Sequence, residues 1–426
     1  MSRIKDASSR AAFSRFGRMG PMVATGVALL LISTACSDNG RVARPTPPSP
    51  SRPRAAASDA SIGASGSPVD SFSARLTWHA PPGSASIQIW RDSRLIDRVA
   101  STASSYVDYL LWQKTTYHYI VAFVDTSGKS MGAYPVRITT PPRSGPFPRL
   151  YAPTSFWNTP IPPSPEIDPN STPIIANSIV RYARNANLVN TSTHAYPIAY
   201  ADPSSSAYAI GCTKYDCQTS VSFPVPTYAR ANSGPDRHLI VIDPSTSSEL
   251  DMFGASCCWT ASSRYVTETN GWGALCPQGQ HCNGAVAAGF AEAGGVIRPE
   301  EILQGSIDHA IALATPYTRA GFIACPATHT DGKYSVTAIP EGARIQLDPG
   351  FNVAGQKWPA WEKVIARALQ VYGAYIVDTS GSLAIRGEGN QTRGYNAWAK
   401  AGVPGVRPTL SNLPWSRFRL LKLTQC

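Results

Sequence analysis

The sequence predicts a mainly β protein, in which a small β-sandwich precedes a large β-rich domain (a sandwich or jelly roll) with a few helices. Charged residues make up only 15% of the 426 residues, which excludes coiled coils and salt-bridged helical arrays. A hydrophobic fraction of 43% excludes a wholly disordered chain. Short runs of alternating apolar and polar residues recur over residues 71–142. Residues 147–426 approach the length, roughly 250–300 residues, at which single cores stop growing.

The first 35 residues have the organisation of a bacterial signal peptide. Five basic residues and one acidic residue within positions 1–20 precede an apolar run from Met22 to Ile32. This run is too short to span a bilayer comfortably, and small residues follow it directly before Cys36. We therefore expect residues 1–35 to direct export and to be removed.

Cys36 adds an expectation about the membrane. The segment 31–36 resembles a lipoprotein signal, in which the cysteine becomes the lipidated first residue. Ser33 stands where such signals usually carry an aliphatic residue, and Ser33 with Ala35 would also suit an ordinary signal peptidase. Both enzymes would cut the same bond. The resemblance implies lipidation of Cys36, a membrane anchor and a place at the cell surface or outside the cell.

The remaining cysteines form an even set of eight: Cys212, Cys217, Cys257, Cys258, Cys276, Cys282, Cys325 and Cys426. An even set in an exported protein predicts disulfide bonds. The short loops Cys212–Cys217 and Cys276–Cys282 are the favoured local pairs. The alternative for the second pair is a metal site shared with His281.

Residues 36–70 are rich in proline, serine and alanine and contain no aromatic residue. Such a segment cannot bury enough apolar surface to offset the entropy of ordering, so we expect a mobile linker. The net charge of +11 is not gathered into a lysine or arginine run, and nucleic acid is therefore not an expected partner. The basic excess would suit an acidic polysaccharide.

The stretch 71–142 resembles a fibronectin type III domain. Leu76 and Trp78 fit its early strand, the run 105–108 fits a later one, and Leu111 precedes the long run 117–125. Tyr117, within that long run, resembles the tyrosine corner of such sandwiches. The resemblance implies a domain that spaces or presents its neighbour, and we assign no chemistry to it.

Six elements are predicted in the large domain from their periodicity. Three are strands: 238–243, 321–324 and 343–347. Three are helices: 172–187, 299–312 and 359–375. Proline at the first position and two glutamates in the first turn support the helix at 299.

Several kinds of catalytic machinery have no motif in the chain. There is no Gly-x-Ser-x-Gly elbow, P-loop, dinucleotide fingerprint or His-Glu-x-x-His motif. We therefore expect no cofactor and no metal, and an exported peptidase or esterase has no nucleophile motif behind it.

Two histidines are candidate acids or bases. His309 lies late in the predicted helix at 299–312, where a packed histidine is the alternative interpretation. His329 and Asp331 follow the predicted strand 321–324, and loops after rigid strands often carry catalytic groups. The two side chains could point together at a substrate or share a metal. Cys325 with His329 would be a thiol nucleophile and its base, an arrangement that disulfide formation would remove.

Carboxylates form a second candidate set. Glu249 and Asp251 lie on one face of a predicted strand, close in sequence to Trp259 and Trp272 as candidate sugar-binding residues. A solvated strand edge is the alternative interpretation. Asp378 ends an apolar strand, and Glu388 lies in a glycine-rich turn.

The candidates fit two carbohydrate-cleaving mechanisms. A hydrolase would use a carboxylate pair drawn from Glu249, Asp251, Asp378 and Glu388. A lyase would use His309 or His329 as the base, with Arg344 or Arg386 neutralising and binding a uronate substrate.

Residues 295–390 also resemble a stretch of uncharacterised exported bacterial proteins, through the runs 297–302, 305–310 and 340–344. That resemblance implies no activity and no catalytic residues. Together these features predict an exported, lipid-anchored monomer whose large domain acts on polysaccharide as a hydrolase or a lyase. The alternative function is a non-catalytic surface protein that binds glycan or adheres to cells.

Overall fold

A computed structural model describes residues 62–215, 217, 220–256 and 259–426. The predicted signal peptide, Cys36 and most of the predicted linker lie outside these residues. No helix within the described residues has the length and apolar character needed to cross a membrane.

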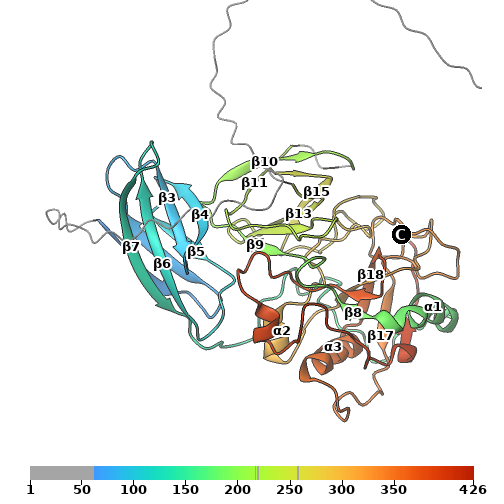
Figure 1. The fold of residues 1–426 in the computed structure, drawn as a ribbon. Coiled ribbons are helices and arrows are strands. Elements are labelled where there is room, and N and C mark those ends of the chain that lie inside the picture. The colour runs from blue at the N-terminus through green and yellow to red at the C-terminus, as the bar shows by residue number, and fades with distance from the viewer. Residues whose placement is uncertain (1–61, 216, 218–219, 257–258) are drawn as a thin grey trace, which may run out of the picture. The chain divides into compact units, whose positions relative to one another are not determined.

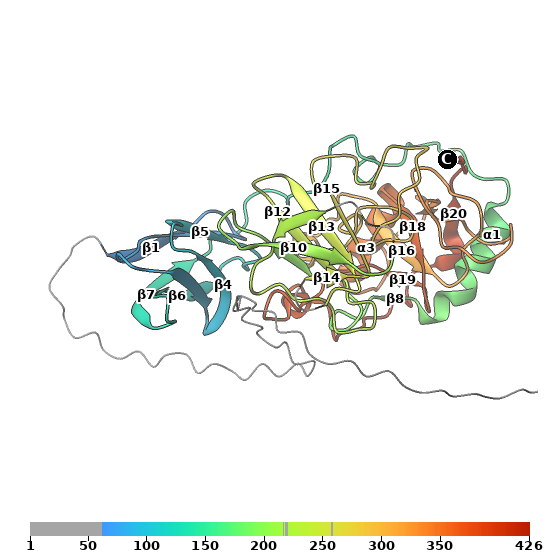
Figure 2. The same cartoon turned by 90° about the horizontal axis from the view of Figure 1, so that it is seen from above.

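Seven strands form the predicted small β-sandwich (Figures 1 and 2). They are β1 (Gly63–Pro68), β2 (Ala74–His79), β3 (Ser86–Arg91), β4 (Arg94–Ala100), β5 (Ser105–Asp108), β6 (Thr116–Val124) and β7 (Ser130–Thr139). One sheet has the order β1-β2-β5 and the other β4-β3-β6-β7, and all their pairs are antiparallel. Alternate residues of β2 point into the core because successive side chains of a strand face opposite sides. The order is that of a fibronectin type III sandwich.

The tyrosine corner lies where the sequence predicts it. The backbone N–H of Trp112 donates to Oη of Tyr117 at 2.6 Å, which ties the start of β6 to the preceding connection. Trp78 is 3% exposed and belongs to the sandwich core, as its place on the early strand predicts.

The first strand lies within the stretch predicted as linker. β1 carries no apolar alternation, which is why the sequence pattern does not reveal it. Gly66 makes the pairing possible, because a Cβ there would lie only 2.7 Å from Cδ1 of Ile138. The linker prediction is therefore wrong for residues 63–68.

Among the residues that the structure describes, the large domain contains three sheets and several short helices (Figure 1). One sheet has the order β15 (Ser263–Glu268), β13 (Ser248–Phe253), β12 (Leu239–Asp243) and β9 (Ile198–Tyr200). The second is β11 (Val221–Pro224), β10 (Ala207–Cys212) and β14 (Thr260–Ala261). The third is β20 (Phe418–Leu420), β17 (Arg344–Leu347), β18 (Ala374–Thr379), β16 (Ile311–Thr315), β19 (Ala384–Ile385) and β8 (Asn187–Leu188).

The mainly β prediction is confirmed. All three sheets of the large domain include a parallel pair, such as β12 with β9 and β16 with β18. A jelly roll has antiparallel sheets, so the predicted sandwich or jelly roll did not include these parallel pairs. Buried strands such as β12 and β16 read as continuous apolar runs, which do not reveal the direction of their partners.

Helices flank the six-stranded sheet (Figure 1). They are α1 (Ser171–Ser178), the 3₁₀ helix η1 (Val180–Asn185), α2 (Pro299–Gln304), α3 (Ala360–Val371), α4 (Ala397–Lys400) and the 3₁₀ helix η2 (Trp415–Arg417). The predicted helix 172–187 is found as α1 with η1, and 359–375 contains α3. Trp361, Ile365 and Leu369 of α3 are buried in the same core as strands β16 to β20.

Two predicted elements are wrong. The helix predicted over 299–312 ends at Gln304, because Gly305 adopts a left-handed φ of 86° that terminates it. The strand predicted over 321–324 does not form; Ala324 makes an isolated bridge with Gln425 instead. His309 is therefore outside a helix, and the His329 loop does not follow a regular strand.

Three disulfides occur among the described residues. The two predicted local pairs, Cys212–Cys217 and Cys276–Cys282, are present, and Cys325 pairs with Cys426. These bonds are consistent with an exported protein. They also overturn two alternatives, since Cys276 and Cys282 bond each other rather than a metal and the sulfur of Cys325 is no free nucleophile.

Candidate active site

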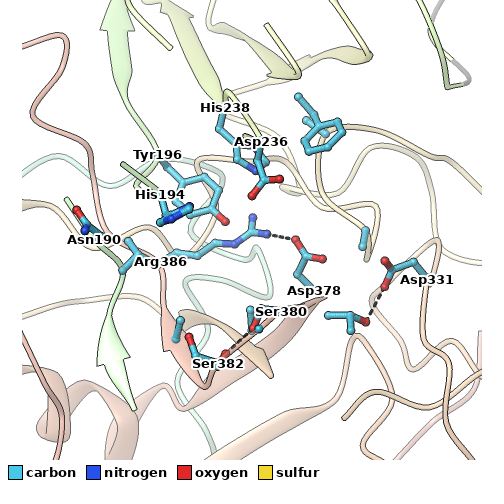
Figure 3. Close-up of a pocket in the computed structure, with 18 of the residues that line it drawn as sticks. Asn190, His194, Tyr196, Asp236, His238, Asp331, Asp378, Ser380, Ser382 and Arg386 are labelled. Carbon is cyan, nitrogen blue, oxygen red and sulfur yellow. Dashed lines mark hydrogen bonds and ion pairs between the residues drawn. The ribbon is translucent and has the colours of Figure 1, made fainter. Parts of the chain in front are cut away.

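A cavity of about 770 Å³ collects polar side chains from segments far apart in the sequence (Figure 3). Its ionisable lining residues are His194, Tyr196, Tyr215, Asp236, His238, His329, Asp331, Asp378, Arg386 and Arg407. Four of them, His329, Asp331, Asp378 and Arg386, were candidates from the sequence. The fold brings these four together.

Strand ends position the central groups. Asp378 lies near the end of β18, and Arg386 follows β19 directly. Main-chain bonds fix Arg386: its N–H donates to the Ala312 carbonyl at 2.9 Å, and its carbonyl accepts from Ile297 at 3.1 Å. Both charged groups are therefore carried by interior strands of the six-stranded sheet or by the residue that directly follows one.

Arg386 and Asp378 form an ion pair inside the cavity (Figure 3). Nη2 of Arg386 lies 2.7 Å from Oδ2 of Asp378, and the guanidinium lies over the Tyr196 ring, 4.3 Å from its centre. Burial raises the pKa of Asp378 to about 6, with Arg386 opposing the rise and the negative charge of Asp331 adding to it. Asp378 therefore keeps its proton to a higher pH than an ordinary aspartate does.

Three carboxylates meet beside this pair. Oxygen atoms of Asp331, Glu341 and Asp378 all lie within 4.8 Å of one another. The hydroxyl of Thr379 donates to Oδ1 of Asp331 at 2.7 Å, and the N–H of Asp331 donates to Oε2 of Glu341 at 3.1 Å. Burial and the charges of Asp378 and Asp331 raise the pKa of Glu341 well above its usual range. Asp331 is the exposed member of the group.

Within the described residues, these carboxylates are the group with the spacing to hold a metal ion. The side-chain donors that bond them are a guanidinium and a hydroxyl, from Arg386 and Thr379. Of these two donors only the guanidinium carries a charge, so it offsets one of the negative charges that the three carboxyls can carry.

His329 has a defined orientation. Its Nδ1 lies 2.8 Å from the Ala287 carbonyl oxygen, so a neutral ring carries its proton on Nδ1. Nε2 has no hydrogen bond to any described residue and retains its lone pair. His329 can therefore accept a proton in the cavity.

His238, which also lines the cavity, has a similar arrangement. Its Nδ1 is in ion-pair contact with Oε1 of Glu292, a carboxylate with no exposed surface. The N–H of Glu292 in turn donates to Oδ2 of Asp251 at 2.9 Å. Asp251 thus bonds the backbone of Glu292 and does not itself line the cavity of the described residues.

Glu249 and Asp251 share one face of β13, as their alternation predicts, but they are fully buried rather than at a solvated edge. Oε2 of Glu249 accepts from the Tyr151 hydroxyl at 2.9 Å, and Oε1 accepts from the Ala293 N–H at 3.1 Å. Burial raises the pKa of both carboxyls, that of Asp251 well above its usual range. The cavity lining among the described residues does not include this pair.

His309 and Arg344 lie away from the cavity. Both ring nitrogens of His309 are engaged, Nδ1 with the Ala310 carbonyl at 2.8 Å and Nε2 with Glu301 at 2.9 Å. Burial acts to lower the pKa of His309, but the charge of Glu301 and the hydrogen bonds to Glu301 and the Ala310 carbonyl together raise it. Arg344 donates to the Tyr372 carbonyl, with its Nε at 2.9 Å. Both side chains have structural partners.

The two candidate sugar-binding tryptophans also lie outside the cavity lining of the described residues. Trp272 is 45% exposed and packs edge-on against Phe156, with ring centres 5.5 Å apart. Trp259 packs on Tyr208 at 5.8 Å.

Sequence reasoning missed several lining residues, notably His194, Tyr196, Asp236 and His238. Asp236 and His238 repeat the spacing of His329 and Asp331, a polar pair at the edge of an apolar run. That repeated spacing was the sequence signal that could have identified Asp236 and His238 as candidate site residues. Nothing local marks His194 or Tyr196, which reach the cavity from the connection between β8 and β9.

Comparisons with known proteins concern the small sandwich. No family model matches the chain, and neither does any curated protein. The fibronectin type III-like modules of Clostridium thermocellum CbhA are 10% identical over 20% of this chain and 99% of their own, with a TM-score of 0.17. A fibronectin type III-like protein of the same organism is 24% identical over 20% of this chain and 93% of its own, also at 0.17.

The Yersinia enterocolitica family 28 exopolygalacturonase is 16% identical over 17% of this chain and 19% of its own, with a TM-score of 0.16. Scores this low decide neither the fold nor the activity of the chain. The strand order described above is what identifies the sandwich.

Proposed function

We propose that the large domain is a polysaccharide hydrolase whose active site is the cavity around Asp378. The observation that carries the proposal is the pair Asp331 and Asp378. Their oxygens lie within 4.8 Å, one carboxyl is exposed, and the other has a pKa of about 6. Two neighbouring carboxyls in such different surroundings suit an acid and a base in one reaction.

The roles follow from these surroundings. Protonated Asp378 would give its proton to the glycosidic oxygen as the bond to the anomeric carbon breaks. The Asp331 carboxylate, oriented by Thr379, would attack that carbon and form a covalent intermediate. Ionised Asp378 would then remove a proton from the water that releases the sugar. The short separation favours this retaining mechanism, because an inverting pair needs about 6.5–9.5 Å to hold a water.

A lyase is the second candidate, and His329 is the observation that favours it. Its Nε2 lone pair could remove the proton next to a uronate carboxylate. Arg386 is less available for neutralising that carboxylate, since it already pairs with Asp378 at 2.7 Å. The hydrolase mechanism does not need Arg386 to bind the substrate and is therefore the proposal.

The setting of the enzyme is also part of the proposal. The three disulfides support export, and the sequence around Cys36 supports a lipid anchor that holds a monomer at the membrane. The alternative is a surface protein that binds glycan without cleaving it.

The test is a product assay on a panel of neutral and acidic polysaccharides with the purified full-length chain. A hydrolase releases reducing ends without ultraviolet absorbance, a lyase releases both, and a binding protein releases neither. Asp378→Asn should lower the rate about 10²–10⁴-fold, the usual contribution of a general acid. Asp348→Asn is the control, since Asp348 is 38% exposed and paired at 3.5 Å with Arg417. Equal activity of the two variants would refute the assignment of Asp378.

A further inference from the structure

One wall of the cavity is a continuous row of four rings: Tyr215, Phe253, His238 and Tyr196. The ring centres are 6.1 Å apart from Tyr215 to Phe253, 5.4 Å from Phe253 to His238, and 4.8 Å from His238 to Tyr196. These spacings lie within the range of direct aromatic contact, so the four rings, tilted by 42–58° from each to the next, form a stepped surface.

The row leads from solvent to the ion pair. Tyr215 is 41% exposed, whereas Tyr196 is 7% exposed and carries the Arg386 guanidinium over its ring. Arg386 in turn bonds Asp378, the proposed acid. A molecule that enters along the rings therefore arrives at the carboxylates.

Other lining residues are polar: Asn187, Asn190, Ser380 and Ser382. Figure 3 shows Ser380 and Ser382 on the side of Arg386 away from His238, and Asn190 beside the backbone end of Arg386. The cavity thus presents aromatic rings on one side and hydrogen-bonding groups on another. A sugar ring has matching surfaces, since its C–H groups pack on the electron-rich face of an aromatic ring and its hydroxyls seek polar partners.

The outermost ring is held in place by its surroundings. The N–H of Tyr215 donates to the Ser262 carbonyl at 2.8 Å, and the Cys212–Cys217 disulfide closes the loop that carries it. Nζ of Lys214 lies 4.8 Å from the centre of the Tyr215 ring. The backbone that carries Tyr215 is thus tied by a hydrogen bond and a disulfide, which lowers the cost of ordering this loop on binding.

We propose that this row is a stacking wall for successive sugar units of a polysaccharide, with Tyr215 as its outer binding subsite. The inference rests on the proposed function, because it takes the substrate class from it. The new element of the inference is that the polysaccharide enters past Tyr215 and that several of its sugar units are bound at once.

The test is electrophoresis in native gels cast with polygalacturonate, alginate, xylan or arabinogalactan. All proteins carry Asp378→Asn, so that cleavage does not alter the gel. We expect at least one polysaccharide to retard the parent protein. The Tyr215→Ala variant should need an about tenfold higher concentration of that polysaccharide in the gel for the same retardation. The Tyr215→Phe variant keeps the ring and should be retarded as strongly as the parent protein.

Tyr208→Ala is the matched control. Tyr208 is also a tyrosine and is 39% exposed, but it packs on Trp259 and does not line the cavity formed by the described residues. Its loss should leave retardation unchanged.

The outcomes separate the stacking wall from the hydrolase. A retarded parent protein with an equally retarded Tyr215→Ala variant overturns the wall alone. Retardation that depends on Tyr215, combined with no product from the unaltered chain, supports the wall and overturns the hydrolase. A parent protein that no gel retards overturns the wall, and the separate product assay then decides the hydrolase.

Discussion

Three charged neighbours and burial act together on the carboxyl group of Asp378. Burial raises its pKa, Arg386 lowers it, Asp331 raises it and His238 lowers it, and the result is about 6 rather than 3.8. A general acid must be protonated to act, so activity should be present below this pKa and lost above it.

The predicted pH dependence follows directly. The value of kcat/KM should fall about tenfold per pH unit once the pH rises above about 6, as Asp378 loses its proton. A pH profile of kcat/KM on the polysaccharide that is cleaved fastest measures this decrease, which is the alkaline limb of the profile. A rate that stays constant from pH 5 to about 8 would show that another group is the acid.

Arg386 should set the position of that limb. The guanidinium stabilises the ionised form of Asp378, so replacing it by glutamine removes the opposing charge and raises the pKa further. We expect Arg386→Gln to move the alkaline limb of kcat/KM to higher pH. Because Arg386 is 1% exposed, thermal unfolding should be followed in parallel to confirm folding. A limb that stays in place or moves to lower pH would contradict the assignment.

At the scale of elements, one glycine joins the main helix to the strand that carries Asp378. Gly373 lies between α3 and β18 with a left-handed φ of 69°, and a Cβ there would collide with the carbonyl oxygen of Ile345. Any other residue would meet both backbone strain and a clash.

Gly373→Ala should therefore destabilise the protein by about 2–5 kcal/mol, the sum of left-handed strain and overpacking. Gly402→Ala is the matched control: its φ is 83°, it also follows a helix, and its Cβ would meet no atom within 4 Å. Gly402→Ala should lower the free energy of unfolding only by the backbone strain, about 1–2 kcal/mol. Denaturant unfolding measures both free energies. Equal losses of stability in the two variants would show that the structure around residue 373 shifts to relieve the clash with the Ile345 carbonyl.

Local pattern predicts the elements whose periodicity is unambiguous. The core stripe of α3 and the alternation of β2 and β6 are of this kind. The sequence after Gly305 is different, since Ile307, Ala310 and Ile311 continue an apolar spacing that also suits a helix. In the structure that stretch leads into β16, which is buried along its whole length.

The site was predictable only in part for a related reason. Asp378 and Glu249 are both acids in apolar strands, and sequence cannot show that one faces a cavity while the other bonds Tyr151. His329 and His309 differ in the same way, because only His309 has both ring nitrogens occupied. Tertiary partners decide these roles.

At the scale of the whole molecule, the chain's last residue secures the loop of His329. Cys426 pairs with Cys325, and main-chain bonds join Cys426 to Ile323 at 3.1 Å and Cys325 to Thr424 at 2.8 Å. His329 lies four positions beyond Cys325 in the same connection. These bonds therefore tie the segment just before His329 to residues 424–426.

This disulfide should also contribute the most stability of the three. It spans a sequence separation of 101, against 5 for Cys212–Cys217, and a longer loop removes more entropy from the unfolded chain. Replacing both Cys325 and Cys426 by serine should lower the free energy of unfolding by about 4.7 kcal/mol. The same replacement at Cys212 and Cys217 should cost about 2 kcal/mol. Denaturant unfolding of both double variants measures the difference, and an equal or reversed order would mean that native-state contacts outweigh loop entropy.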